Sequence, residues 1–227
     1  MNRTYAIFRM HAKDKLSWFY LPWIIMLFSF SVNLVIAAFV DEPVTTGGVA
    51  SMYIYMMVTG MIVVSQTFSF ALGLSVSRRD YFNGTMLMAA ISGLIASVGL
   101  LVLSSIEQGT SGWGVDLHFY HFPYLNEGGL LEQVWIFFVL MTNFFLSGFF
   151  ISSFQRRYGG MALTLFLAVL AVIIGIITFI ISNEGWWGGI GDWLSSYSAG
   201  QLASMLFVLS LIYAASTFRL LRKSTVS

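Results

Sequence analysis

The sequence contains no cysteine, and few of its residues are charged. Of 227 residues, none is Cys and 9% are Asp, Glu, Lys or Arg. The absence of cysteine excludes disulfide bonds, thiolate metal sites and a cysteine nucleophile. Soluble domains carry about 25% charged residues, so this composition excludes an ordinary soluble domain. With 58% hydrophobic residues, the chain is expected to be an integral membrane protein.

Motifs for nucleotide hydrolysis and for hydrolytic catalysis are also missing. A phosphate-binding loop of the form Gly-x-x-x-x-Gly-Lys-Ser/Thr does not occur, and the lone Lys-Ser pair, Lys223-Ser224, has no glycines before it. Neither Gly-x-Ser-x-Gly nor His-Glu-x-x-His is found. No catalytic residue is therefore assigned, and the chain itself is not expected to be an enzyme or to hold a cofactor.

What the sequence does contain is a series of long apolar runs. Each is long enough to cross about 30 Å of hydrocarbon as a helix. The runs are Trp18–Val40, Val49–Leu74, Met86–Ile106, Leu130–Phe154, Met161–Ile181 and Ala199–Phe218. The expected fold is an all-α integral membrane protein with six transmembrane helices in residues 18–218. Residues 1–17 are expected to form a basic amphipathic helix on the cytoplasmic membrane surface, and residues 219–227 a basic cytoplasmic tail.

The two signs of charge are segregated along the chain. With the N-terminus inside, all 11 Lys and Arg residues fall in inner segments. The outer loops carry acidic residues instead, namely Asp41, Glu42, Glu107, Asp116, Glu127, Glu184 and Asp192, with Glu132 at the outer edge of the fourth span. Cytoplasmic loops are enriched in Lys and Arg, so both termini are expected to be cytoplasmic. The expected location is the plasma membrane, with lipid and no nucleic acid as a partner.

A short charged turn, Ser75–Thr85, separates the second and third spans. Its paired arginines, Arg78 and Arg79, are explained by contacts with lipid phosphates on the inner face. The acid and two aromatic residues that follow, Asp80–Phe82, suit a groove on a cytoplasmic partner, on a short helix that Asn83-Gly84 would end. The residues alone leave both interpretations open.

The run Phe70–Thr85 resembles the end of the second span and the following turn in small bacterial ABC exporter permeases of the type-2 exporter superfamily. The order of parts is similar too, with an amphipathic N-terminal helix, six spans and a short outer hairpin between spans five and six. The resemblance implies a coupling helix docked on an ATPase subunit that binds ATP and magnesium, and a second permease subunit, identical or paralogous. The implied ATPase contacts are Arg78, Arg79, Asp80, Tyr81 and Phe82, with a weaker second contact at Arg156, Arg157 and Tyr158.

Two outer segments are longer than the other connections. Ser182–Ser198 contains Trp-Trp-Gly-Gly-Ile-Gly. Its residues suit a flexible loop with interfacial tryptophans, whereas the resemblance implies a re-entrant hairpin that closes the outer exit. In the second case Trp186, Trp187 and Trp193 would form the gate. Glu107–Gly129 is longer than expected in the family, and no role is assigned to it.

Inside the spans, no Asp, Glu, Lys, Arg or His lies near the midplane. Proton-coupled transporters need a titratable group there, so this absence argues against a proton-driven antiporter, whereas an all-neutral sodium site stays open. The neutral polar residues Asn33, Gln66 and Asn143 suit hydrogen bonds between helices, with the lining of a transport pathway as the alternative.

The resemblance implies that the chain is the permease subunit of an ATP-driven exporter. Its neutral, Phe- and Met-rich spans suit an amphiphilic or hydrophobic cargo, such as a peptide, a lipid-like molecule or a toxin. The alternative is a non-transporting scaffold, sensor or immunity protein that binds a partner through its inner turns. A membrane metalloenzyme using His118, His121 and Asp116 is a third hypothesis. That segment offers no clear third and fourth ligand, so no metal site is assigned.

Overall fold

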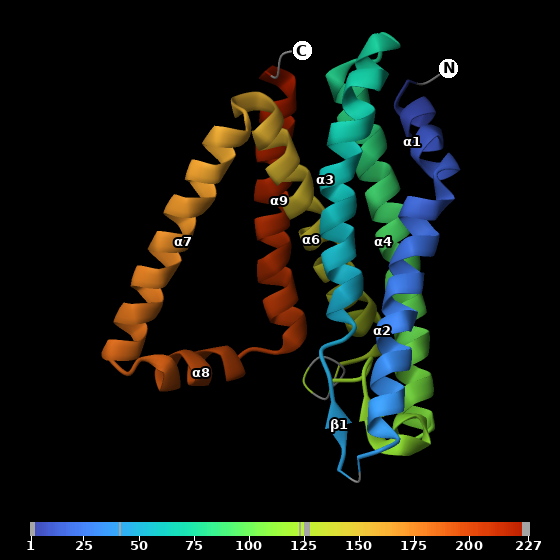
Figure 1. Cartoon of the computed structure of the whole chain (residues 1–227), viewed down its shortest axis with the longest axis vertical. Helices are drawn as coiled ribbons and strands as arrows, with labels where there is room; N and C mark the ends of the chain where they lie inside the picture. Colours follow the sequence, from blue (N-terminus) through green and yellow to red (C-terminus); the bar gives the residue numbers. More distant parts are fainter. Residues whose placement is uncertain (1–2, 41, 123, 125–127, 224–227) are drawn as a thin grey trace.

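In the computed structural model the chain is almost entirely helical (Figure 1). The structure describes residues 3–40, 42–122, 124 and 128–223. The helices are α1 (Arg3–Lys13), α2 (Leu21–Ala37), α3 (Ala50–Gly73), α4 (Arg78–Gly109), α6 (Leu130–Tyr158), α7 (Gly160–Asn183), α8 (Trp187–Ser195) and α9 (Ala199–Lys223). The shorter elements are η1 (Leu16–Tyr20), a wide helical turn that leads into α2, then β1 (Val44–Thr45), η2 (Gly112–Asp116) and β2 (Leu117–His118).

Six stretches of helix are long and apolar enough to cross a membrane, as the sequence predicts. They are Leu16–Ala37, Ala50–Gly73, Arg78–Gly109, Leu130–Tyr158, Gly160–Asn183 and Ala199–Lys223. The all-α fold and the six helices long and apolar enough to span a membrane are therefore confirmed. The largest difference in bounds is in α4, which starts at Arg78 instead of Met86.

The helix stop predicted at Asn83-Gly84 is wrong, because α4 runs through both residues without a break. Gly84 instead lies where α1 crosses α4. A Cβ at this position would lie 2.6 Å from the Thr4 carbonyl oxygen and 2.7 Å from the Ile7 Cβ. Close approach of two helices therefore accounts for the glycine. The segment Arg78–Phe82 is the beginning of a long helix and not a separate short one.

The two ends of the bundle differ in charge. α1, the α3–α4 turn, the α6–α7 turn and the C-terminal end of α9 lie at one end, at the top of Figure 1, which we call the basic end. It carries Arg3, Arg9, Lys13, Lys15, Arg78, Arg79, Arg156, Arg157, Arg219, Arg222 and Lys223. β1 and α8 lie at the opposite end, the acidic end. It carries Glu42, Glu107, Asp116, Glu132, Glu184 and Asp192. Asp41 and Glu127 lie outside the described residues.

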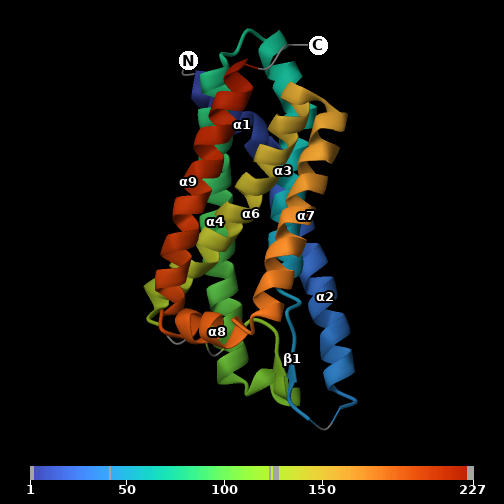
Figure 2. The ribbon, with the colours of Figure 1, turned by 90° about the vertical axis from the view of Figure 1, so that its left-hand side faces the viewer.

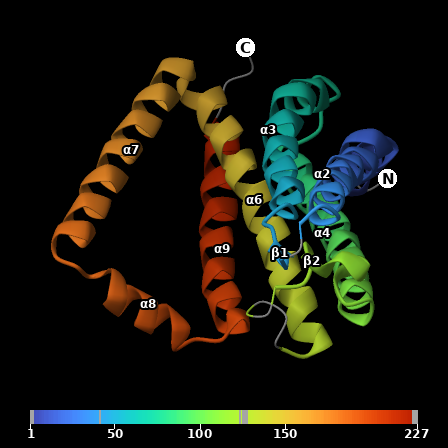
Figure 3. The same ribbon diagram turned by 60° about the horizontal axis from the view of Figure 1, so that its bottom comes forward.

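α6 is the central helix and packs against α3 on one side and α9 on the other (Figures 2 and 3). Two glycines bring α3 and α6 together backbone to backbone. A Cβ on Gly148 would overlap the Met57 carbonyl oxygen, and one on Gly60 would lie 2.8 Å from the Phe149 nitrogen. Small residues permit such contacts between membrane helices, where dispersion forces replace the hydrophobic effect. This contact fixes the distance between the two helices.

α7 and α8 project from the rest of the bundle (Figures 1 and 3). Neither helix has a buried residue. α7 contacts the bundle mainly through α6, where the rings of Phe154 and Phe166 lie 5.0 Å apart. Gly159, with a φ of +86°, makes the turn between the two helices. An apolar helix without buried residues has to face lipid or another membrane protein.

The re-entrant hairpin expected between spans five and six is not formed. The segment folds as one helix, α8, which runs across the acidic end from α7 to α9 (Figure 1). A hairpin needs a reversal of the chain within the segment. The only positive φ among the described residues there is that of Gly185, +68°, which precedes α8. The later glycines adopt helical conformations and so continue the helix.

Candidate functional site

Asp80 holds the basic-end turn and α1 together. Ser77 caps α4, because its Oγ accepts a hydrogen bond from the Asp80 N–H at 3.1 Å and donates one to Asp80 Oδ2 at 2.6 Å. The other carboxylate oxygen accepts a bond from Thr4 Oγ1 at 2.9 Å. Arg3 Nη1 donates to the Ser75 carbonyl oxygen at 2.8 Å. α1 is therefore bound to the turn at two points.

The two aromatic residues predicted to contact a partner, Tyr81 and Phe82, both pack against other parts of this chain. Tyr81 is fully buried, and its hydroxyl donates to the Val63 carbonyl oxygen at 3.0 Å and lies 2.9 Å from Thr67 Oγ1. Phe82 is half-buried, with its ring 5.2 Å from that of Phe218. Tyr81 is therefore not free to fill a groove on another protein, whereas part of the Phe82 side chain stays exposed.

Arg79 is the exposed charge of the turn. Its neighbour Arg78 donates a hydrogen bond from Nη1 to the Arg222 carbonyl oxygen at 2.7 Å, which ties α4 to the end of α9. Arg79 makes no hydrogen bond or salt bridge with any residue that the structure describes. Of the five predicted contact residues, Arg79 is therefore the one whose charge is available to a partner.

The second predicted contact, at the α6–α7 turn, also contains both residues that pack within the chain and residues that face outward. Arg156 hydrogen-bonds Ser69 Oγ, and its guanidinium lies 4.8 Å from the centre of the Phe68 ring, so that it faces α3. Arg157 lies over the ring of Tyr158 at 4.8 Å. Tyr158 is exposed. The groups of this turn that face outward are therefore Arg157 and Tyr158.

His11 is a buried titratable group of the basic end, and it lies between α1 and α4. Its Nε2 is 3.0 Å from Thr85 Oγ1, and the residue is 2% exposed. Its ring packs against those of Trp18 and Tyr81. Burial lowers the pKa of His11 to about 4, against a smaller opposing effect of the Asp14 carboxylate. The neutral imidazole is therefore the form that holds the two helices together.

Acidification is expected to release α1 from α4. A detached histidine has a pKa near 6.5, so detached α1 binds a proton before packed α1 does. The free energy with which α1 packs on α4 has its full value above pH 6.5. It decreases by about 3 kcal/mol as the pH falls toward 4. Hydrogen exchange of the α1 amides, corrected for intrinsic rates, should rise from pH 7 to pH 5. A His11→Gln variant should lose this dependence; an unchanged profile in the variant would contradict the assignment.

The acidic end has a folded cap, formed by residues 107–121 together with β1, that the sequence analysis missed. Glu107, in the last turns of α4, is 1% exposed. Its carboxylate accepts hydrogen bonds from Trp113 Nε1 at 2.9 Å and from the N–H of Phe119, Tyr120 and His121 at 2.9–3.1 Å. Since three of these four donors are backbone groups, no pattern of side chains signals the site.

The acidic-end cap has an unusual backbone. Ser111, Trp113 and Asp116 have φ values of 50°, 63° and 50°, and a left-handed residue other than glycine costs about 1–2 kcal/mol. The bonds to Glu107 offset this cost. The parallel pairing of β1 with β2 adds the α2–α3 connection to the cap. No role was assigned to the long Glu107–Gly129 segment from the sequence. Its strand β2 joins the connection after α4 to the connection between α2 and α3.

The residues of the hypothetical metal site do not form a ligand set. His118 lies in β2 opposite Thr45, Asp116 is exposed, and His121 Nδ1 lies 3.2 Å from Ser104 Oγ. Within the described ranges, no group of three His, Asp or Glu residues is placed to hold a metal ion. The geometry gives the metalloenzyme hypothesis no support.

The three predicted pathway residues have separate surroundings. Asn33 donates to the Ser29 carbonyl oxygen of its own helix at 2.8 Å. Gln66 is exposed on α3. Asn143 donates to Ser210 Oγ at 3.0 Å and so links α6 to α9. Asn143 therefore makes a hydrogen bond between helices, which is the first of the two predicted roles. The three residues do not line a common pathway.

The tryptophans predicted to form a gate lie on or beside α8. Trp186, Trp187 and Trp193 are each more than half exposed. Trp187 Nε1 donates to Ser182 Oγ at 3.0 Å, and the Trp193 ring lies 5.1 Å from that of Tyr197. Their partners are thus local, and the three rings do not close an opening against another helix in the described part of this chain.

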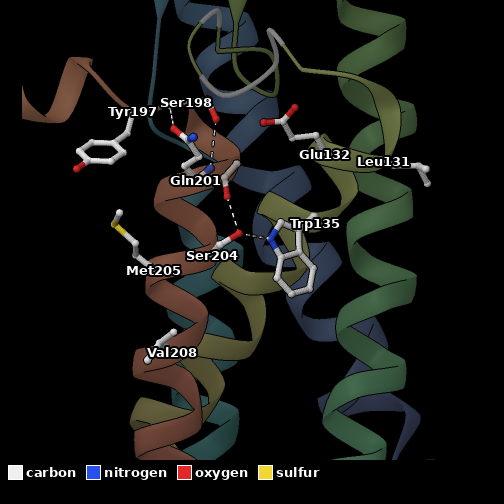
Figure 4. Close-up of a pocket in the computed structure, with 10 residues that line it drawn as sticks. Leu131, Glu132, Trp135, Tyr197, Ser198, Gln201, Ser204, Met205 and Val208 are labelled. Carbon is white, nitrogen blue, oxygen red and sulfur yellow. Dashed lines mark hydrogen bonds between the residues drawn. The ribbon is translucent and has the colours of Figure 1, made fainter.

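A groove opens between α6 and α9 at the acidic end (Figure 4). Its volume is about 750 Å³, within the range of pockets that bind small molecules. Its lining residues are Leu131, Glu132, Trp135, Tyr197, Ser198, Gly200, Gln201, Ser204, Met205 and Val208. A more polar pocket of about 400 Å³ adjoins it and shares Glu132, Tyr197 and Ser198. From the sequence, Glu132 stood out as an acidic residue at the edge of a span.

Comparison with known proteins assigns no family. No family model matches the sequence, and no curated protein and no solved structure matches it either. The function of the chain has to be inferred from its own residues and their geometry.

Proposed function

We propose that this chain is the permease subunit of an ATP-driven ABC exporter and works with a separate ATPase subunit. The observation that carries the proposal is that α1, the α3–α4 turn and the end of α9 are hydrogen-bonded into one unit at the basic end. A turn that only anchors on lipid needs free basic side chains, whereas Arg3 and Arg78 are used within the chain. At the basic end, α1, the α3–α4 turn and α9 are joined to one another, and Arg79 is exposed. This arrangement suits the transmission of force from a partner.

The contacts around the turn suggest how that force would travel. Tyr81 hydrogen-bonds the Val63 carbonyl oxygen, so α4 and α3 are joined just inside the turn. The glycine contact at Gly60 and Gly148 joins α3 to α6. Closure of the ATPase pair against Arg79 would therefore move these three helices together. In this proposal the basic end is cytoplasmic, as the positive-inside rule predicts.

The exposed α7 and α8 support the presence of a second permease subunit, identical or paralogous. Neither helix has a buried residue within one chain, so both are free to contact another subunit or lipid. We propose an amphiphilic or hydrophobic cargo, because the groove between α6 and α9 has mostly apolar walls with a carboxylate at one side.

Reversing the charge of Arg79 is expected to remove the ATPase. In mild detergent, a nucleotide-binding protein should co-purify with the tagged wild-type chain and be at least tenfold less abundant with Arg79→Glu. The reason is that Arg79 is exposed and makes no hydrogen bond or salt bridge within the described part of the chain. At an interface, a charge pair that becomes a repulsion costs several kcal/mol. Co-purified ATPase activity is the measurement.

The matched control is Arg219→Glu, which reverses another exposed arginine of the basic end. It should retain the ATPase. Tyr81 is left unchanged, since altering a fully buried residue would disturb the fold. If no nucleotide-binding protein accompanies the wild type in several detergents, the exporter proposal is wrong and a non-transporting membrane protein is favoured.

A further inference from the structure

Glu132 brings a carboxylate to the groove between α6 and α9. It lies half-buried in the first turn of α6. Its carboxylate makes no hydrogen bond or salt bridge with any residue in the described part of the chain. A Cβ on Gly200 would overlap Oε1, and one on Gly128 would overlap Oε2. The carboxylate thus lies between two glycines, where a cationic group of a ligand would stabilise its partly buried charge.

Several other polar groups of the groove have partners within the chain (Figure 4). Trp135 Nε1 donates to Ser204 Oγ at 3.2 Å, and that hydroxyl donates to the Gly200 carbonyl oxygen at 2.8 Å. Ser198 and Gln201 exchange two bonds, at 3.0 and 3.3 Å. These bonds fix the wall of the groove before a ligand arrives. Among the lining residues, Glu132 is the charged one.

The remaining walls are apolar or aromatic. Met205 and Val208 follow Gly200 along α9, one and two turns deeper into the bundle, and both are exposed. Trp135 and Tyr197 place aromatic rings on the lining, and aromatic faces attract cations. A molecule with its charge at the carboxylate would therefore have space for an apolar tail along α9.

We propose that this groove binds the ammonium group of an amphiphilic cation, with Glu132 as the counter-charge and Met205 and Val208 along the tail. The charge of the seat excludes anionic amphiphiles, and the apolar wall disfavours small hydrophilic cations. Two sources supply this chemistry, an amine lipid headgroup and a free cationic amphiphile. The binding of an amphiphilic cation is inferred from the groove alone. That this ligand is the transported cargo rests on the proposed exporter function.

Binding of dodecylammonium to the purified full chain tests the proposal. The titration is done by calorimetry in neutral maltoside micelles, where non-specific partition into the micelle is the same for every variant. Glu132→Gln keeps the shape and removes the charge, and it should weaken saturable binding at least tenfold. Gly200→Ala keeps the charge and fills the seat, and it should weaken binding as well. Glu184→Gln, which removes an exposed charge elsewhere at the acidic end, should bind like the wild type.

Two further arms separate the sources of the ligand. If phosphatidylethanolamine competes with dodecylammonium and phosphatidylglycerol does not, the site takes the amine of a lipid. If neither lipid competes, it takes a free amphiphile. Equal binding by wild type and Glu132→Gln, or no saturable binding to folded wild type, would overturn the proposal. Because this assay contains no ATPase, its failure is distinct from loss of the co-purified ATPase, which would refute the exporter function.

Discussion

Replacing Glu107 with alanine is expected to open the acidic-end cap and to lower the free energy of unfolding by about 3–5 kcal/mol. The change leaves the indole N–H of Trp113 and the backbone N–H groups of residues 119–121 without their acceptor. Each buried donor left without a partner costs about 1–3 kcal/mol. Water that enters the opened cap recovers part of that cost, so the total is smaller than the sum.

The effect should be local as well as global. Amide hydrogen exchange at Phe119–His121 should become fast, and the melting temperature in detergent should fall by roughly 10 °C. Glu184→Ala is the control, because that exposed acid should change stability by less than about 0.5 kcal/mol. Amides 119–121 that stay protected in Glu107→Ala would show that the carboxylate is not what organises the cap.

Replacing Gly148 with leucine is expected to force α3 and α6 apart. A Cβ at this position already overlaps the Met57 carbonyl oxygen, and backbone cannot rotate away as a side chain can. Overpacking of a well-packed interior costs about 1–3 kcal/mol for added methylenes, and this contact involves two helix backbones, so we expect at least the upper value. Gly148→Ala should also destabilise the contact between α3 and α6, but by less than Gly148→Leu.

Gly175→Ala is the matched control for the helix contact. Gly175 lies in the exposed helix α7, and no atom lies within 4 Å of a Cβ built there. Alanine should therefore be neutral or stabilise the chain by up to about 1 kcal/mol, because it favours the helical backbone. Thermal unfolding in detergent measures both variants. If the two alanine variants behave alike, the close contact of α3 and α6 is not a determinant of stability.

The six spans were predictable from the sequence because hydropathy acts over some twenty neighbouring residues. The segregation of charge was predictable for a similar reason, since Lys and Arg cluster in the short loops. Tyr81 shows the limit of this approach. It follows three charged residues and was predicted to face a partner, yet it lies on the side of α4 that faces Val63. Loop composition does not reveal that α4 begins before the apolar run does.

The acidic-end cap and the groove were beyond the reach of sequence patterns. Glu107 reads as a surface acid at the end of a span, and its burial depends on backbone N–H groups twelve to fourteen residues later. The seat of Glu132 depends on Gly200, which lies in another helix. Gly60 and Gly148 meet across two helices in the same way. Each of these features is a tertiary contact between residues far apart in the sequence. No repeating motif or fixed spacing in a single sequence indicates which of them meet.

The pairing of β1 with β2 sets an order for the synthesis of the protein. Val44 leaves the ribosome long before its partner Leu117, and α3 and α4 must be made in the interval. The cap therefore closes only after the third span has been translated, and it then locks the loops on both sides of α3 and α4. A nascent chain arrested after His121 carries every donor that Glu107 accepts from, and one arrested before Leu117 cannot close the cap.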